Sequence, residues 1–215
     1  MERKYAFWTA VATLAALALS AVLYPSLPDR IPTHWNLRGE ADGFGAKSWA
    51  AFLGPLVMAG LILLFRILPW LSPRSFALDG FRPTYLYVGL VLVLLAGYIH
   101  GIALWSSLEE GVDLRRALFG GLCLGFALLG NVLGKVERNF YVGIRTPWTL
   151  ASERVWYATH RVAAWTFAVG GVVGFCLVVA GGWMISAGVV IGVAVVLPVV
   201  HSLIYYKKLE ASGRL

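Results

Sequence analysis

VAAWTFAVGGVVGFCLVVAGGWMISAGVVIGVAVVLPVVHSLIYY, residues 162–206, is the stretch that decides the fold of this chain. It contains no Asp, Glu, Lys or Arg, and only Gly181 and Gly182 separate two apolar runs. Each run is long enough to cross a bilayer as a helix, and so short a connection makes the two helices antiparallel neighbours. Four similar runs precede them. The sequence therefore predicts six membrane spans, at 5–24, 49–71, 85–105, 117–133, 162–180 and 183–206.

The composition of the whole chain supports a membrane protein and excludes other classes. Of its 215 residues, 59% are hydrophobic and only 13% are charged, whereas an average soluble domain carries about 25% charged residues. The apolar content also excludes a disordered chain. The first run has no clear small-residue cleavage site, so it is predicted to be an uncleaved span rather than a signal peptide. The predicted fold is an all-α, polytopic integral membrane protein.

The net charge of +7 is explained by membrane topology. If the N-terminus is placed inside, 13 of the 18 basic residues fall on the inner side, whereas the 11 acidic residues divide five inside and six outside. Cytoplasmic segments of membrane proteins carry such an excess of Lys and Arg. We therefore expect both termini to be cytoplasmic and the segment after the first span to be extracytoplasmic. No basic excess remains to indicate a nucleic-acid partner.

The extracytoplasmic segment at 24–47 is predicted to form an ordered cap. Three prolines, at positions 25, 28 and 32, disfavour a regular helix and favour extended or turn conformations. A simple linker would be rich in Ser and Gly and would lack Trp, yet this segment contains several groups that can pack or bind. The candidate ligand- or partner-binding residues of the cap are His34, Trp35, Asn36 and Gly39.

A metal site at the cap is a second interpretation of the same residues. His34 could bind a metal together with Glu40, Asp42 or His100. The spacing of these residues resembles no strong ligand pattern. A hydrogen bond within the loop, or a place in a partner-binding surface, is the simpler interpretation of His34. No metal and no cofactor are therefore predicted.

A second polar segment, at 130–161, lies on the cytoplasmic side. Asn131, Lys135 and Arg138 would share one face if the fourth helix continued past the membrane. Thr146 precedes a proline and is expected to be extended, and Ser152 is expected to begin a helix that runs into the fifth span. An interfacial anchor would explain the Arg and Trp residues but not the clustered polar ones. The candidate binding residues are Asn131, Arg138, Asn139, Gly143, Arg145, Thr146, Pro147, Trp148, Trp156 and His160.

Both polar segments resemble known signatures. LPDRIPTHWNLRG at 27–39, followed by DG at 42–43, is similar to the DUF1648 region. RNFYVGIRTPWTL at 138–150, with VW at 155–156 and HR at 160–161, resembles the signature of the SdpI family. The resemblance implies a DUF1648-like unit over residues 1–71, containing the first two spans and the cap. It implies an SdpI-like unit over residues 72–215, containing the other four spans and the GIRTPWTL loop.

The resemblance implies a role in immunity. Similar proteins are bacterial proteins of the inner (cytoplasmic) membrane that protect a producer cell from its own membrane-active peptide toxin, and some relay the presence of toxin to a cytoplasmic repressor. The implied partners are a peptide toxin at the outer face, a cytoplasmic repressor and membrane lipids. No enzymatic activity is implied, and no residue is assigned a catalytic role.

Two alternatives of other classes stay open at this stage. A membrane enzyme or transporter could act on a lipid or small anion, with Arg138 and Arg145 holding a phosphate and His160 serving as acid or base. The absence of a carboxylate from every predicted span weakens that reading, since proton-coupled transporters usually contain one. A structural partner within a larger complex would instead use both polar segments as docking surfaces.

Overall fold

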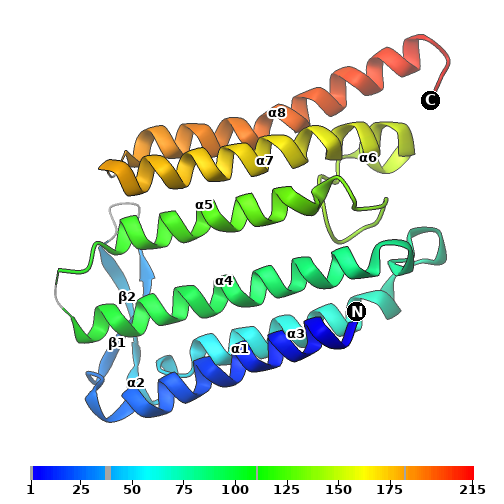
Figure 1. Cartoon of the computed structure of the whole chain (residues 1–215). Helices are drawn as coiled ribbons and strands as arrows, with labels where there is room; N and C mark the ends of the chain where they lie inside the picture. The colour runs from blue at the N-terminus through cyan, green and yellow to red at the C-terminus, as the bar shows by residue number, and fades with distance from the viewer. Residues whose placement is uncertain (1, 37–39, 110, 182) are drawn as a thin grey trace.

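Six long helices dominate the computed structural model, which describes residues 2–36, 40–109, 111–181 and 183–215. They lie side by side, and a small β-hairpin stands at one end of the bundle (Figure 1). The long helices are α1 (Glu2–Leu23), α3 (Leu53–Leu71), α4 (Arg82–Leu108), α5 (Leu114–Leu133), α7 (Glu153–Gly181) and α8 (Met184–Ala211). The short elements are η1 (Tyr24–Ser26), β1 (Arg30–Trp35), β2 (Ala41–Ala46), α2 (Lys47–Ala50), η2 (Arg74–Phe76), η3 (Asp79–Phe81) and α6 (Pro147–Ala151).

The six membrane spans predicted from the sequence are confirmed as helices. Within the described residues, six helices are long and apolar enough to cross a bilayer. Their outer surfaces are rich in exposed aliphatic and aromatic side chains, such as Leu14, Leu63 and Ile204. In water this exposure would be costly, but in a bilayer the lipid tails are as apolar as the side chains. The chain is therefore a multi-pass membrane protein.

The bundle has two distinct ends. Both termini lie at one end, here called the terminal end, and the β-hairpin lies at the other, here called the hairpin end (Figure 1). The segment that joins α5 to α7, residues 134–152, also lies at the terminal end and is called the terminal loop. The two polar segments singled out in the sequence therefore lie at opposite ends of the bundle.

The helices pack as two groups of three. α1 and α3 pack on α4, while α5 and α8 pack on α7, and α4 contacts α5 where the groups meet. The tightest approach is between α5 and α7. A Cβ atom added at Gly130 would meet the Ala168 backbone, and one added at Gly171 would meet the backbone of Cys123 and Ala127. Small residues hold membrane helices together because they let the backbones approach closely.

The cap is a two-stranded antiparallel hairpin, so the all-α prediction holds for the spans but not for the cap. Arg30 pairs with Ala46 and Trp35 with Ala41, with a register irregularity at His34. The hairpin is fixed to the bundle by buried Ile31, which packs in a cluster with Leu104 of α4. The expectation of an extended, ordered cap follows from the prolines, but the pairing of the strands does not.

The fourth helix ends with its predicted span and does not continue into the terminal loop. α5 stops at Leu133, and the chain turns at Gly134. The condition under which Asn131, Lys135 and Arg138 would share one helical face is therefore not met, because the last two lie beyond the helix. The beginning of α7 directly after Ser152 is confirmed, as is the extended conformation of Thr146, which has φ −96° and ψ 160°.

Candidate functional site

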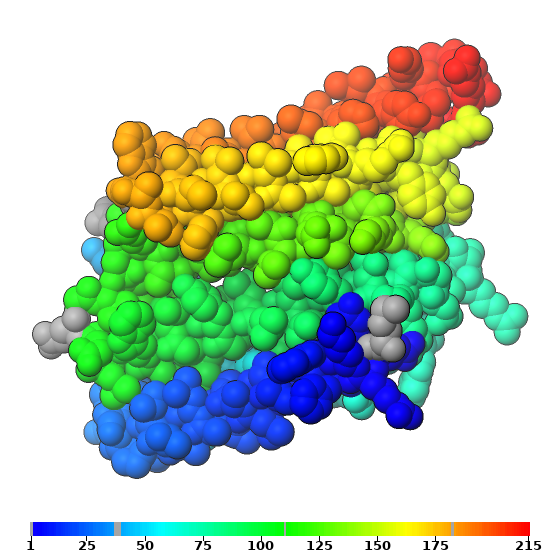
Figure 2. Space-filling view, in the orientation of Figure 1, coloured from blue at the N-terminus to red at the C-terminus, as the bar shows by residue number. Residues whose placement is uncertain are grey.

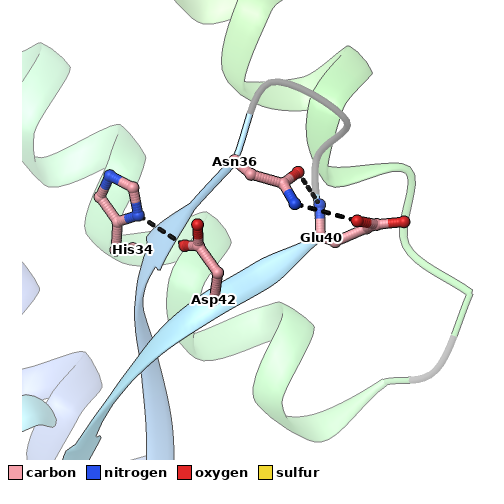
Figure 3. Close-up of polar contacts among 4 residues, drawn as sticks. All are labelled: His34, Asn36, Glu40 and Asp42. Carbon is pink, nitrogen blue, oxygen red and sulfur yellow. Dashed lines mark hydrogen bonds and ion pairs between the residues drawn. The ribbon is translucent and has the colours of Figure 1, made fainter.

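Two polar pairs hold the outer part of the hairpin together (Figure 3). Nδ1 of His34 lies 2.5 Å from an Asp42 carboxylate oxygen across the two strands. Near the turn, the Asn36 amide donates to the Glu40 carboxylate at 2.9 Å, and the Glu40 backbone N–H donates to the Asn36 side chain at 3.1 Å. The His34 side chain is 72% exposed, so its ring edge is presented to the surroundings by a fixed strand.

Trp35 has a different environment from its neighbours in the cap. Its side chain is half-buried, and its indole Nε1–H is buried without a hydrogen-bond partner among the described residues. A buried donor left unpaired costs about 1–3 kcal/mol. Because the nitrogen itself is buried, a ligand's carbonyl oxygen would reach this donor and recover that free energy only after the residues around the indole had moved.

The structure also bears on the metal interpretation of the cap. Among the residues that the structure describes, no group of three His, Cys, Asp or Glu side chains could hold a metal ion. His100 is not a partner of His34, because it is buried within the bundle with its Nε2 2.8 Å from the Ser20 hydroxyl. Gly39, the remaining candidate of the cap, lies outside the described residues.

A cavity of about 720 Å³ opens at the hairpin end between α4, α5 and α7. Its walls are mostly apolar, and Glu109, Asp113 and Arg116 stand at its rim. The cavity adjoins the cap through α4, because Leu104 packs against the hairpin and the next residue, Trp105, lines the cavity. The principal apolar wall residues are Tyr98, Trp105, Leu124, Phe175 and Val178. None of these wall residues is among the candidates named from the sequence.

Asn139 organises the first part of the terminal loop. Its buried amide nitrogen donates to the carbonyls of Glu137 and Val142, at 2.8 and 3.0 Å. Its side-chain oxygen accepts from the backbone N–H groups of Tyr141 and Val142, at 2.7 and 2.8 Å. Four hydrogen bonds use most of the capacity of an amide side chain. Asn139 therefore shapes the loop from within.

His160 plays a similar part on the other side of the loop. Its Nε2 accepts from the Ile144 backbone N–H at 3.0 Å, so the ring proton is on Nδ1, which donates to the Trp156 carbonyl at 2.8 Å. The ring is fully buried and stacks on Trp156 with the centroids 4.0 Å apart. Gly143, at φ +111°, passes so close that a Cβ there would meet the ring. Both ring nitrogens are engaged, which argues against an acid or base role.

Arg138 fastens the loop to its surroundings. It donates to the Leu150 carbonyl at 2.8 Å and lies 3.4 Å from the Glu153 carboxylate. Its guanidinium also lies 5.1 Å from the centre of the Phe76 ring, in the segment between α3 and α4. This cation–π contact joins the terminal loop to the first group of helices.

Asn131 and Arg145 lie apart from this network. Asn131 is on α5, where its side chain interacts with the Tyr87 side chain of α4. This interaction favours a tie between helices, one of the two roles expected for a polar side chain at membrane depth, and the choice between the two roles stays a prediction. Arg145 is exposed and donates to the Phe140 carbonyl. The arginines at 138 and 145 thus bond different backbone carbonyls within the loop.

The sequence Thr146-Pro147-Trp148 begins the short helix α6. Thr146 and Thr149 form a capping box, and Pro147 occupies the first turn, where its missing N–H costs nothing. The helix directs Trp148 toward α8, where its indole N–H donates to the Ser202 hydroxyl at 2.5 Å. Thr149, which the candidate set omitted, is fully buried and donates to the Ile144 carbonyl at 2.8 Å.

Ser202→Ala is expected to lower the free energy of unfolding by about 1–2 kcal/mol, because it leaves the Trp148 donor without its acceptor. The change is measured as a lower midpoint in thermal unfolding of the purified protein in detergent. Ser106→Ala is the matched control, since the Ser106 hydroxyl bonds only a carbonyl of its own helix, that of Ala103. Equal midpoints for the two variants would contradict the role assigned to the Trp148 bond.

Most candidate residues of this region therefore lie close together, but their side chains are connected by hydrogen bonds to backbone groups rather than to one another. Asn139, Trp156 and His160 are buried, and Gly143 lies against the His160 ring. Arg138 and Trp148 connect the loop to other segments. The hydrogen bonds to the backbone were not foreseeable, because backbone carbonyls carry no sequence signature. The features that define this protein are thus a membrane bundle, a structured cap at one end and a self-bonded loop at the other.

The comparisons with known proteins agree with these features. Residues 11–59 match the domain of unknown function DUF1648, and residues 135–202 match the SdpI/YfhL protein family. The chain is 31% identical over 197 residues to the immunity protein SdpI of Bacillus subtilis (strain 168), covering 90% of this chain and 91% of that protein. No solved structure matches the chain. This chain belongs to the SdpI/YfhL protein family.

Proposed function

We propose that this protein gives its cell resistance to a membrane-active peptide toxin. The proposal is supported by the similarity to the immunity protein SdpI over nine-tenths of the chain and by the six-span bundle. The distribution of basic residues favours a location in the cytoplasmic membrane with the terminal end inside and the hairpin end outside. A toxin that arrives from outside then meets the hairpin end first.

The toxin site of this proposal is the cap together with the adjoining cavity. The observation that carries it is the buried indole N–H of Trp35, which has no partner among the described residues, next in the chain to the exposed ring of His34. A peptide carbonyl oxygen would accept from Trp35, and Asn36 lies at the same edge of the hairpin. An apolar side chain of the peptide would enter the cavity beside Trp105. Amphipathic peptides carry both kinds of group.

A relay to a cytoplasmic regulator is the second part of the proposal. The terminal loop exposes Phe140, Arg145 and Pro147 at its surface, a mixed apolar and basic surface suited to a protein partner. Relay demands two conformations of the bundle that differ in affinity for the toxin. The Trp148 bond to α8 and the Arg138 contact with Phe76 connect this surface to both helix groups, so the loop would respond to a shift of either.

The double variant His34→Ala, Trp35→Ala tests the toxin site. We expect it to abolish protection, because it removes both the exposed ring and the unpaired donor of the cap. The measurement is survival of a complemented knockout strain against membrane-active peptides, with the amount of protein in the membrane measured in parallel. Ser48→Ala, an exposed change near the same hairpin, is the control and should retain protection. Full protection by the double variant at normal membrane levels would refute the role of the cap.

A further inference from the structure

A second cavity lies at the terminal end, far from the cap. It has a volume of about 300 Å³ and is enclosed by α1, α3 and α4. Figure 2 shows the N-terminal turns of α1, in dark blue, lying over the terminal half of α4. None of the candidate residues described above lines this cavity, so the proposed toxin site and the terminal loop do not account for it.

The lining of this cavity changes from charged to apolar with depth. Arg3, Arg66 and Arg82 lie where α1, α3 and α4 reach the terminal end. Further in, the walls are aliphatic and extend to Val93. From Arg82 to Val93 the helical rise amounts to about 16 Å, close to half of a hydrocarbon core that is about 30 Å thick. The cavity therefore has the length of one leaflet, with charge at the surface and apolar walls inside.

The charge at the mouth is not balanced by the protein. The cavity is lined by three arginines and one carboxylate, Glu2. That carboxylate pairs with Arg82 Nε at 2.7 Å, whereas Arg3 and Arg66 have no ion-pair or hydrogen-bond partner among the described residues. Guanidinium groups prefer phosphate oxygens as partners. A phosphate at the mouth would offset the two unpaired charges.

The walls of the cavity are held in place by packing. The Tyr85 hydroxyl donates to the Phe65 carbonyl at 2.9 Å, and the two rings lie 4.8 Å apart. Phe65 lies against Gly89, where an added Cβ would meet the ring at 2.8 Å. These contacts join α3 to α4 alongside the opening, so the cavity is present before a ligand enters.

We propose that this cavity binds one anionic phospholipid of the cytoplasmic leaflet. Its phosphate lies against Arg3 and Arg66, and one acyl chain runs along the aliphatic wall toward Val93. The long apolar wall of the cavity favours a lipid over free phosphate, because a free anion would contact only the arginines at the opening. This inference is independent of the toxin site and requires only that the terminal end face the cytoplasm.

Native mass spectrometry of the purified protein in detergent tests the proposal, with phosphatidylglycerol and phosphatidylcholine as probes. We expect the wild type to retain one phosphatidylglycerol in preference to phosphatidylcholine. Arg3→Gln with Arg66→Gln should weaken that retention about 25-fold, since each basic residue near an anionic headgroup contributes ~1 kcal/mol and 1.4 kcal/mol is tenfold. Arg161→Gln, an exposed change on α7, is the matched control and should stay within about twofold of the wild type.

A second variant tests the apolar part without touching the charges. Among the described residues, the Thr9 hydroxyl bonds only carbonyls of its own helix, so Thr9→Leu fills the cavity and leaves no described tertiary partner unpaired. We expect weaker retention of phosphatidylglycerol with an unchanged thermal midpoint. Equal retention of the two lipids by the wild type, an equal loss with Arg161→Gln, or displacement of the lipid by millimolar inorganic phosphate would each overturn the proposal.

Discussion

Gly171→Ala and Gly130→Ala are expected to cause large losses of stability, about 3 kcal/mol each. At both positions a new Cβ would meet backbone atoms of the partner helix, and a backbone cannot rotate aside as a side chain can. Forcing a methyl group into a packed interior costs about 1–3 kcal/mol. We expect a cost at the upper end of this range, because α5 and α7 would have to move apart to make room for the methyl group. The measurement is the thermal midpoint of the purified protein in detergent.

The bundle provides graded controls for this experiment. An added Cβ at Gly192 has nothing within 4 Å, and one at Gly120 would make only ordinary contacts, the nearest with Val178 at 3.6 Å. Gly192→Ala should be neutral or slightly stabilising, because alanine favours a helix by about 1 kcal/mol over glycine. The thermal midpoint of Gly120→Ala should be close to that of Gly192→Ala. If Gly171→Ala had the same thermal midpoint as Gly192→Ala, the close approach of α5 and α7 would not contribute to stability.

Gly143→Ala is expected to disrupt the terminal loop by two separate effects. The residue has φ +111°, a backbone conformation that costs an L-residue about 1–3 kcal/mol. The new Cβ would also displace the His160 ring and break its hydrogen bond from the Ile144 N–H. Leaving that donor unpaired adds about 1–3 kcal/mol. We expect a lower thermal midpoint and faster proteolysis within residues 134–152.

Gly213→Ala is the comparison for Gly143→Ala. Gly213 has φ +64°, yet an added Cβ there has nothing within 4 Å. It is therefore a control for adding a methyl group at a glycine with positive φ and no neighbour, although its φ lies in the left-handed region that L-residues tolerate better than the φ of Gly143. If the two variants lowered the midpoint equally, the contact between Gly143 and His160 would be unimportant. A larger loss at Gly143 is the expected result, because this residue has the less favourable φ and also lies against the buried His160 ring.

The spans were predictable because membrane insertion depends on a one-dimensional property, the length of an apolar run. The predicted span at 117–133 ends at the same residue as α5, Leu133. The span at 162–180 is the apolar part of the longer α7, whose early start the sequence also indicated through Ser152. The division into units at residues 71 and 72, and the cytoplasmic placement of the termini, stay predictions.

The candidate site was less predictable, because its interactions join residues through backbone atoms and between helices. Polar clustering correctly drew attention to Asn139 and His160, but their partners are carbonyl and N–H groups. Pairing of His34 with Asp42 depends on the register of the hairpin, which includes an irregularity at His34 itself. Both cavities are formed by three helices each, and no pattern along one helix reveals such a space.

The bond between Trp148 and Ser202 has a consequence for biosynthesis. Ser202 lies in α8, 54 positions after its partner, so the acceptor for the Trp148 indole does not exist until α8 has been synthesised. Chains truncated before α8 would leave the indole without this acceptor. The segment at residues 134–152 is thus fixed only after α8 has been made, and a chaperone or protease that binds loosely packed segments could distinguish molecules with α8 from those without it.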